Sequence, residues 1–281
     1  MYIREVKHPK YDLYLRKYTK KAFYKKHWTE ETLNARGHVV DSAGVLVARP
    51  FRKIFNVGEH PSASYEEFRR RVARGSLTCD VKFNGHLAIL FNYCGEWINT
   101  TSGSFEHDFI ARDRELIEEA ADLERLNPAF TYMFEIIGLH DIHLLTHRHI
   151  EDLGGECAVG IGQIHTESGV SLKLERSRFM PPDLAKDDDL FDNLLEPKRV
   201  EGWVFTDIVD GWQAKIKTHW YFQQRYVYNI AKTKFPELKE EYGYSERALE
   251  ELPEELYKLY EEYCNVGDTA WSTVHAKILS F

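Results

Sequence analysis

The sequence predicts an α+β protein built on antiparallel sheets, with a small helical appendage at its C-terminal end. Short apolar or alternating segments occur in adjacent pairs joined by turn residues, which is typical of β-hairpins. Clear helical patterns are fewer, and they dominate only after about residue 222. The chain has 281 residues, of which 43% are hydrophobic, and this allows one large domain with or without an appendage.

In the first half of the chain, most of the expected elements are strands. They are, in order, a partly helical segment at 1–30, two short strands within 36–50, a short helix near 64–74, strands at 79–91 and 96–101, and a helix at 108–125. The run "LAILFNY" is apolar on both faces, so we expect it in the middle of a sheet. Asp108 is the expected N-cap of the last helix.

The second half combines strands with a helical end. Its expected elements are a strand at 132–138, a hairpin at 156–175 turning at Glu-Ser-Gly, a hairpin at 200–218 with Asp-Gly at its tip, helix from His219 onward, and an amphipathic helix or helix pair at 245–263 broken near Pro253. We therefore divide the chain into a basic N-terminal segment (1–34) packed on a main domain (35–222), and a helical appendage (223–281).

Composition and charge narrow the class of protein. The formal net charge of −8 argues against indiscriminate nucleic-acid binding, which calls for a basic chain. Basic residues nevertheless concentrate in 1–30 and 69–74 and form either a surface for a polyanion or ordinary solvated faces. No membrane span or signal segment is expected, so we expect a cytoplasmic protein, or one in the host cytoplasm if it is viral. The four cysteines form no CxxC pair and are expected to be free thiols.

Five ionisable residues stand in otherwise apolar strands. They are Lys82, Glu135, Glu201, Lys215 and Lys217. In "WQAKIKT" the two lysines share one strand face, and a simple cross-strand ion pair with Glu201 is one interpretation. The other is chemical, because lysines beside carboxylates are what phosphoryl or nucleotidyl transfer needs to bind phosphate oxygens and metal ions.

The order of these residues resembles the covalent nucleotidyltransferase superfamily of ligases and capping enzymes. The matching pieces are "KFNG" (82–85), "FE" (134–135), "EGWVF" (201–205) and "KIK" (215–217). Two further blocks, 35–59 and 215–224, resemble the phage-type RNA ligases, the family of T-even phage RNA ligase. The resemblance extends from about Ala35 to Phe222 and implies an antiparallel-sheet nucleotidyltransferase (adenylyltransferase) domain.

This resemblance implies an ATP-dependent RNA ligase of RNA repair. Lys82 would attack the α-phosphate of ATP and hold AMP, which then passes to an RNA 5′-phosphate before a 3′-hydroxyl seals the strand. The implied nucleotide site comprises Arg36, Lys53, Val81, Lys82, Asn84, Gly85, Glu135, Glu201, Lys215 and Lys217. Arg36 and Lys53 would contact the ATP phosphates, and Lys215 and Lys217 the α-phosphate.

The resemblance also implies a divalent metal, Mg²⁺ or Mn²⁺, served by Glu135 and Glu201 directly or through water. We expect burial and neighbouring cations to lower the pKa of Lys82 and so expose the lone pair of its amine. The favoured oligomeric state is a monomer.

Three positions depart from the family pattern. Asn84 replaces the usual aspartate of KxDG, Thr100 and Ser102 stand where the phage pattern has lysines, and "HDIHLLTHRH" (140–149) replaces a basic segment. With no cysteine nearby, these histidines do not favour a zinc site, and we assign them no role.

Other functions remain open. One is another covalent nucleotidyltransferase, a DNA ligase or a GTP-using capping enzyme, although no OB-fold pattern follows residue 222. The other is a catalytically weakened binder of RNA ends, for which Asn84 is the support.

Overall fold

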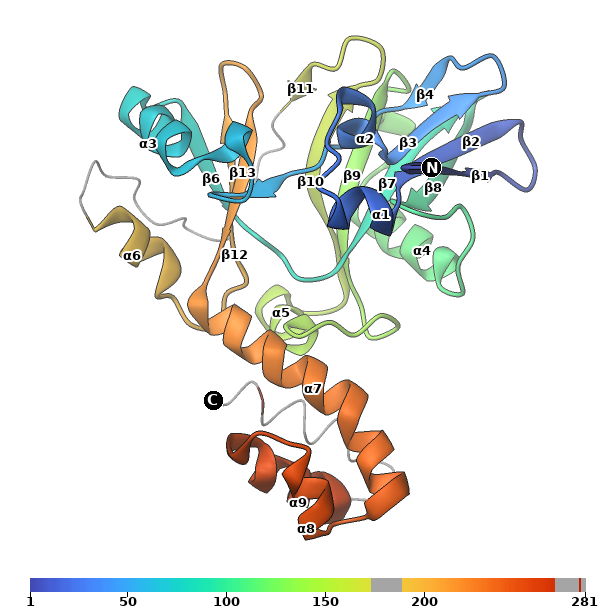
Figure 1. The fold of residues 1–281 in the computed structure, drawn as a ribbon. Coiled ribbons are helices and arrows are strands. Elements are labelled where there is room, and N and C mark those ends of the chain that lie inside the picture. Colours follow the sequence, from blue (N-terminus) through green and yellow to red (C-terminus); the bar gives the residue numbers. More distant parts are fainter. Residues whose placement is uncertain (173–188, 266–277, 279–281) are drawn as a thin grey trace.

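The chain folds into three small β-sheets flanked by helices, followed by a helical appendage (Figure 1). This computed structural model describes residues 1–172, 189–265 and 278. The first sheet has the order β1 (Ile3–Lys7), β2 (Leu13–Tyr18), β3 (Arg36–Asp41), β4 (Leu46–Ala48). The second has the order β11 (Ser171–Leu172), β10 (Cys157–His165), β9 (Phe130–Ile137), β7 (His86–Tyr93), β8 (Glu96–Thr101). The third has the order β5 (Phe55–Asn56), β13 (Gln213–Lys217), β12 (Gly202–Asp207), β6 (Leu77–Val81).

Every strand pair is antiparallel in the described residues except β5 with β13, which is parallel. The α-helices are α1 (Lys20–Tyr24), α2 (Glu30–Asn34), α3 (Tyr65–Arg74), α4 (Ile110–Ala120), α5 (Thr146–Leu153), α6 (Leu190–Leu195), α7 (His219–Tyr242), α8 (Glu246–Glu250) and α9 (Tyr257–Asn265). Three short 3₁₀ turns lie at Pro61–Ala63, Leu123–Arg125 and Glu254–Leu256. The fold is α+β with antiparallel sheets, as predicted.

The second sheet is apolar on both faces, as its sequence predicts. On one face, Ile89 and Phe91 of β7 pack with Leu13, Leu15 and other side chains of the first sheet. The opposite face packs on α4, whose Leu116 and Ile117 join side chains of β7, β9 and β10 in a second core. Because β7 lies between β9 and β8, its residues 88–90 pair with a neighbouring strand on both sides, which suits the buried middle of the strand.

The third sheet has a core of its own. Phe68 of α3 and Leu194 of α6 pack with Phe205 of β12 and Ala214 of β13, and all four side chains are fully buried. Burying them stabilises this half by about 1.5–3 kcal/mol for each large side chain. The sheet therefore holds β6, β12 and β13 in a fixed register, and these strands carry or border four of the five ionisable residues.

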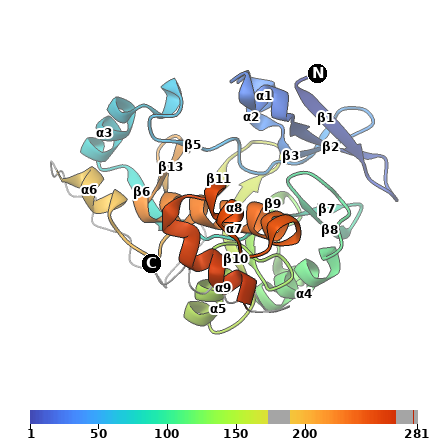
Figure 2. The same ribbon diagram turned by 60° about the horizontal axis from the view of Figure 1, so that its bottom comes forward.

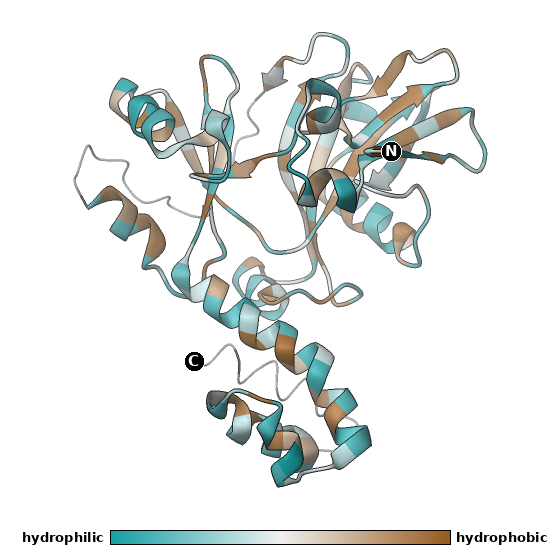
Figure 3. Ribbon diagram, viewed as in Figure 1, coloured by the Kyte–Doolittle hydropathy of each residue, from teal (hydrophilic) through white to brown (hydrophobic). Residues whose placement is uncertain are grey.

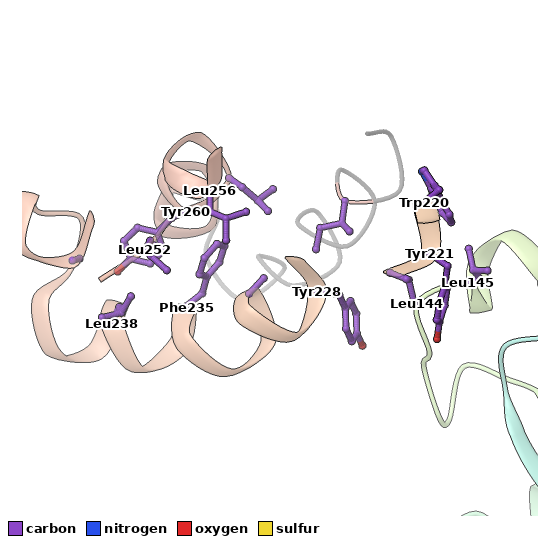
Figure 4. Close-up of a cluster of buried hydrophobic side chains, with 14 residues drawn as sticks. Leu144, Leu145, Trp220, Tyr221, Tyr228, Phe235, Leu238, Leu252, Leu256 and Tyr260 are labelled. Atoms are coloured by element: carbon purple, nitrogen blue, oxygen red, sulfur yellow. The ribbon is translucent and has the colours of Figure 1, made fainter. Parts of the chain in front are cut away.

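The appendage packs around α7, the longest helix (Figures 1 and 2). Phe235 and Leu238 of α7 share a buried cluster with Leu252, which follows α8, and with Tyr260 of α9, as Figure 4 shows. The hydropathy colouring shows apolar residues on several sides of these helices, interrupted by polar ones (Figure 3). No helix among the described residues is long and apolar enough to cross a membrane.

The first turn of α7 also belongs to the main body. Trp220 and Tyr221 of this turn share a buried cluster with Leu144 and Leu145, which precede α5 (Figure 4). Thr218 caps the helix, since its hydroxyl accepts from the N–H of Tyr221 and donates to the carbonyl of Val200. The start of α7 is thus fixed against both the second hairpin and the α5 segment.

Several expected elements are confirmed, including the helix at Tyr65–Arg74 and the break near Pro253. The expected single strand 79–91 is wrong: β6 and β7 lie in different sheets, and residues 82–85 link them. Asp108 does not cap α4, because the helix begins at Ile110 with Phe109 at its N-cap. The segment 1–30 contains two strands, β1 and β2, that the sequence did not predict. Residues 173–175 of the first expected hairpin lie outside the described residues.

Candidate active site

Lys82 lies where the chain leaves the third sheet. Its backbone N–H donates to the carbonyl of Gly202 over 2.8 Å, so it continues the pairing of β6 with β12. Four residues later, at His86, the chain enters β7 in the second sheet. The lysine that reads as part of a continuous strand therefore stands at a junction between two sheets, where residues of both can reach its side chain.

Glu201 binds two of the predicted lysines. Its Oε1 lies 3.0 Å from Nζ of Lys82 and 2.8 Å from Nζ of Lys217, and the carboxylate is buried. Gly202 makes this approach possible: it has φ of 151°, and a Cβ there would lie 2.0 Å from the carbonyl oxygen of Ile216. In the "EG" pair, Glu201 thus supplies the carboxylate and Gly202 allows the close contact with β13.

The charges around Lys82 correct one expectation. Burial disfavours its charged form, but Glu201 and then Glu135 outweigh burial and raise the pKa of Lys82. Burial likewise raises the pKa of Glu201, yet Lys82 and Lys217 hold that pKa below its ordinary value. In this arrangement Lys82 is an ammonium, so the prediction of a lowered pKa is wrong.

Asn84 is held by four hydrogen bonds. Its side-chain Nδ2 donates to Oε2 of Glu201 over 2.8 Å and to the hydroxyl of Tyr221 over 3.2 Å. Its Oδ1 accepts from the N–H of Leu145 over 3.0 Å, and its own N–H donates to Nε2 of His149 over 3.1 Å. Burial lowers the pKa of His149 to about 4, so its ring is neutral near pH 7 and can accept this bond.

Gly85 connects the loop to Glu135 on β9. Its N–H donates to Oε1 of Glu135 over 3.0 Å. A Cβ at residue 85 would lie 2.0 Å from the carbonyl oxygen of Ile136, so only glycine allows the loop to lie this close to β9. The glycine of "KFNG" therefore fixes the position of the Lys82 loop against the second sheet.

Lys215 lies among other cations. In the strand register, Lys215 lies opposite Val204 across the hairpin and opposite Asn56 of β5. Burial, followed by the charges of Lys53, Lys82, Lys217 and Arg36, lowers the pKa of Lys215 to about 7. Since each of these cations is close enough to act on Lys215, the structure brings five predicted basic residues to one place.

Arg36 and Lys53 come from the segments that precede β6. Arg36 begins β3, and burial lowers its pKa while Tyr18 and Glu135 oppose that shift. Lys53 has Nζ 3.3 Å from Oε1 of Glu59 and 4.6 Å from the ring centre of Phe55.

Val81, the last predicted member of the site, packs its side chain on the core of the third sheet. Its contribution to a nucleotide site would therefore come through the backbone.

Sequence reasoning missed three residues beside the site. Tyr221 and His149 contact Asn84, and Lys17 of β2 has Nζ 3.4 Å from Oγ of Ser102. Burial and the nearby Arg4 and Arg36 lower the pKa of Lys17. Lys17 thus supplies a cation beside the Thr100–Ser102 segment where the family pattern expects lysines. Of these three residues, only Tyr221 lies in a segment with a recognisable sequence pattern, the block "KIKTHWYFQQ".

No family model matches the sequence, and no curated protein matches it. Among solved structures, an archaeal ATP-dependent RNA ligase is similar in fold, with a TM-score of 0.55 and 11% identity over 100% of this chain and 72% of that chain. A second form of an archaeal ATP-dependent RNA ligase gives a TM-score of 0.48 with 12% identity, over 86% of this chain and 65% of that one. A Naegleria gruberi RNA ligase with PPi gives 0.43 with 12% identity, over 62% and 57%.

At this identity the likeness concerns the fold alone. The antiparallel α+β architecture is similar to that of the archaeal ATP-dependent RNA ligase of the first comparison, and this likeness covers 100% of the chain.

Proposed function

We propose that the protein is an ATP-dependent RNA ligase of the phage type, joining 5′-phosphate and 3′-hydroxyl ends through AMP held on Lys82. The observation that carries this proposal is the convergence of Arg36, Lys53, Lys82 and Lys217 on Lys215, with Lys82 and Lys217 both on Glu201. Five cations against the three carboxylates of Glu59, Glu135 and Glu201 leave an excess of positive charge, which fits a triphosphate. RNA repair, with ATP and RNA as substrates, would take place in the cytoplasm, or in the host cytoplasm for a viral protein.

In the first step Nζ of Lys82 attacks the α-phosphorus of ATP. The ammonium first releases one proton to solvent; a nitrogen–phosphorus bond then forms, the bond to pyrophosphate breaks, and the nitrogen releases a second proton to solvent. Lys82 must therefore leave its ion pair with Glu201, 3.0 Å away. Once that contact opens, burial and the neighbouring Lys215 and Lys217 favour the neutral amine. The same lysines bind the negative charge that develops on the phosphate oxygens.

Transfer of AMP then completes the proposed reaction. A 5′-phosphate oxygen of RNA displaces Lys82 from the phosphorus, and the RNA 3′-hydroxyl finally displaces AMP. Glu135 accepts a hydrogen bond from the N–H of Gly85 and, in the proposed reaction, would bind the ribose. Lys17, close to Arg36, offers a further phosphate contact.

A divalent metal fits this site only in part. Both oxygens of Glu201 already have partners, Lys82 and Lys217 on one and Asn84 on the other. Glu135 and Glu201 belong to no group of three metal-binding side chains in the described part of the chain. We propose that Mg²⁺ or Mn²⁺ is held by these two residues through water and by phosphate oxygens. When bound, the metal neutralises phosphate charge.

Incubation with a divalent metal and α-labelled ATP or GTP, followed by a denaturing gel, tests the proposal. We expect an acid-labile label from ATP alone. Lys82→Ala and Lys82→Arg should remove it, while Lys258→Ala, at an exposed position of α9, should retain it. Label from GTP would indicate a capping enzyme, and no label from either nucleotide would contradict an enzymatic role. Sealing of nicked RNA and nicked DNA with 5′-phosphate ends then identifies the polynucleotide.

A further inference from the structure

A second cluster of ionisable side chains surrounds Asp113 of α4. Asp113 is fully buried, and three histidine rings meet its carboxylate. Nε2 of His86 lies 2.9 Å from Oδ2, Nε2 of His140 lies 3.1 Å from Oδ1, and Nε2 of His107 lies 3.4 Å from Oδ2. The ligand atoms of His86, Asp113 and His140 all lie within 4.8 Å of one another. One carboxylate does not need three imidazoles for its own hydrogen bonds.

This cluster is separate from the Lys82 site. His86, Ala88 and Leu90 lie two residues apart along β7, so their side chains point to the same face of the second sheet. Because Ala88 and Leu90 pack in the α4 core, His86 also points to the α4 face. Glu135 is paired with Leu87, which belongs to the opposite face. The histidines and the nucleotide-site carboxylate thus lie on the two sides of one sheet.

The separations between the carboxylate of Asp113 and the three histidine nitrogens suit a tetrahedral metal ion. Bonds of about 2.0–2.1 Å to nitrogen or oxygen place tetrahedral ligands about 3.3 Å apart. The nitrogen–oxygen separations around Asp113 are 2.9, 3.1 and 3.4 Å. Within the described part of the chain, both ring nitrogens of His107 are buried and make no hydrogen bond. An imidazole nitrogen whose lone pair accepts no hydrogen bond is free to bind a metal ion.

The surroundings resemble the outer shell of a metal site. Nδ1 of His86 lies 3.1 Å from Oδ2 of Asp141, and the same oxygen is bonded to Nε2 of His143 at 3.0 Å. A carboxylate behind a ligating histidine fixes the ring and raises its basicity. The ring of Phe109 packs against His86 and His107 with ring centres 5.2 and 4.4 Å apart, and covers this side with an apolar group.

We propose that His86, His107, Asp113 and His140 bind one divalent transition-metal ion of the Zn²⁺ class in a structural site. Three imidazoles and one carboxylate suit Zn²⁺ and disfavour Mg²⁺, which requires oxygen ligands in an octahedron. The ion would link β7 and α4 to the segment before α4, which carries His107, and to the segment after β9, which carries His140. The donors come from four segments, which is why the spacing within 140–149 alone does not reveal the site.

Cobalt substitution tests the proposal without any ligase assay. The full chain is stripped with a chelator and titrated with Co²⁺. We expect an intense visible absorption of tetrahedral Co²⁺ that saturates at one equivalent and is abolished by one equivalent of Zn²⁺ but not by excess Mg²⁺. The absence of such a band, or the weak band of six-coordinate Co²⁺, would overturn the proposal.

Variants identify the ligands. We expect His140→Ala and His107→Ala to weaken Co²⁺ binding about tenfold or more, and Asp113→Asn to do the same if it folds by circular dichroism. His147→Ala, at an exposed position of α5, is the matched control, because it leaves all four proposed donors and the contact of Asp141 with His143 in place. Loss of the band in His143→Ala with retention in His107→Ala would assign the ion to His86, Asp141 and His143 instead and overturn the proposed donor set. A protein that forms AMP-lysine but binds no Co²⁺ would refute this site and leave the proposed function intact.

Discussion

The side-chain amide of Asn84 donates a 2.8 Å hydrogen bond to Oε2 of Glu201, the carboxylate whose other oxygen holds Lys82. The orientation of the amide is fixed by its partners, because Leu145 offers an N–H that only the oxygen can accept. An asparagine therefore fits this position better than the aspartate of the related motif. In the present geometry an aspartate oxygen would face the oxygen of Glu201.

We expect Asn84→Asp to destabilise the protein more at high pH than at low pH. Two carboxylates this close share a proton, so the folded state binds it up to a higher pH than the unfolded chain, whose aspartate titrates near ~3.9. The free energy of unfolding of the variant, relative to wild type, therefore falls as pH rises above that value, by about 2 kcal/mol at pH 8. Urea unfolding at pH 5 and pH 8 measures the difference.

Asn84→Ala is the control for this change, since it removes the hydrogen bonds that the amide donates, and also the one that its oxygen accepts, without adding a charge. Its loss of stability should be equal at the two pH values. An Asn84→Asp variant with the same loss at pH 5 and pH 8 would show that its carboxylate does not face Glu201.

We expect Glu201→Gln to make Lys82 a more reactive amine. Glu201 is the largest electrostatic contribution that raises the pKa of Lys82 against burial, so its removal lowers that pKa. Each unit of lowering multiplies the neutral fraction by about ten below the pKa. Labelling by an amine-specific reagent at pH 8, read at Lys82 by mass spectrometry, should be faster in the variant.

Glu59→Gln serves as the comparison, because Glu59 pairs with Lys53 rather than Lys82. It should leave the labelling rate of Lys82 unchanged. Slower or unchanged labelling of Lys82 in Glu201→Gln would contradict the assigned ion pair.

We expect Gly85→Ala to disrupt the loop between the sheets. Its Cβ would meet the carbonyl oxygen of Ile136 at 2.0 Å, and backbone on both sides must move. The expected loss is about 1–3 kcal/mol of unfolding free energy. In Gly95→Ala, where nothing lies within 4 Å, the cost is about 1 kcal/mol from its positive φ alone. Equal losses for the two variants in chemical denaturation would rule out a tight contact at residue 85.

Much of the site could be predicted because its residues stand in strands of recognisable pattern. Lys215 and Lys217 share a face, as the alternation in "WQAKIKT" requires, and the Asp-Gly turn brings the second strand back beside Glu201. These local patterns leave open whether the two lysines form a simple ion pair with Glu201 or belong to a cluster of cations that binds phosphate. The structure shows that the ion pair with Glu201 and the cation cluster are both present.

The remaining features depend on contacts between distant segments. Asn84 bonds to Leu145 and His149 across 61 and 65 residues and to Tyr221 across 137, and no spacing in the sequence reports these contacts. The pKa of Lys82 was predicted in the wrong direction for the same reason, because the sequence does not place Glu201 on its ammonium. The strand 79–91 was read as continuous since apolar residues flank Asn84 and Gly85 on both sides.

The pKa of Lys215, about 7, makes phosphate binding depend on pH near neutrality. Burial and four neighbouring cations favour the neutral amine in the free protein, whereas a bound phosphate favours the ammonium. Binding therefore takes up a proton above pH 7, and affinity falls as pH rises. At pH 6 most of Lys215 is already protonated, and at pH 8 most is not.

We expect the affinity for α,β-methylene ATP, which cannot transfer AMP by loss of pyrophosphate, to fall about tenfold from pH 6 to pH 8 relative to Lys215→Arg. The arginine stays charged throughout this range, so the ratio of the two affinities cancels the titration of the nucleotide's own phosphate. Calorimetry in buffers of different ionisation enthalpy should show uptake of about one additional proton at pH 8 in wild type compared with the variant. A ratio that does not change with pH would mean that Lys215 is charged before the nucleotide binds, and that the cations around it are compensated by the carboxylates of Glu135 and Glu201.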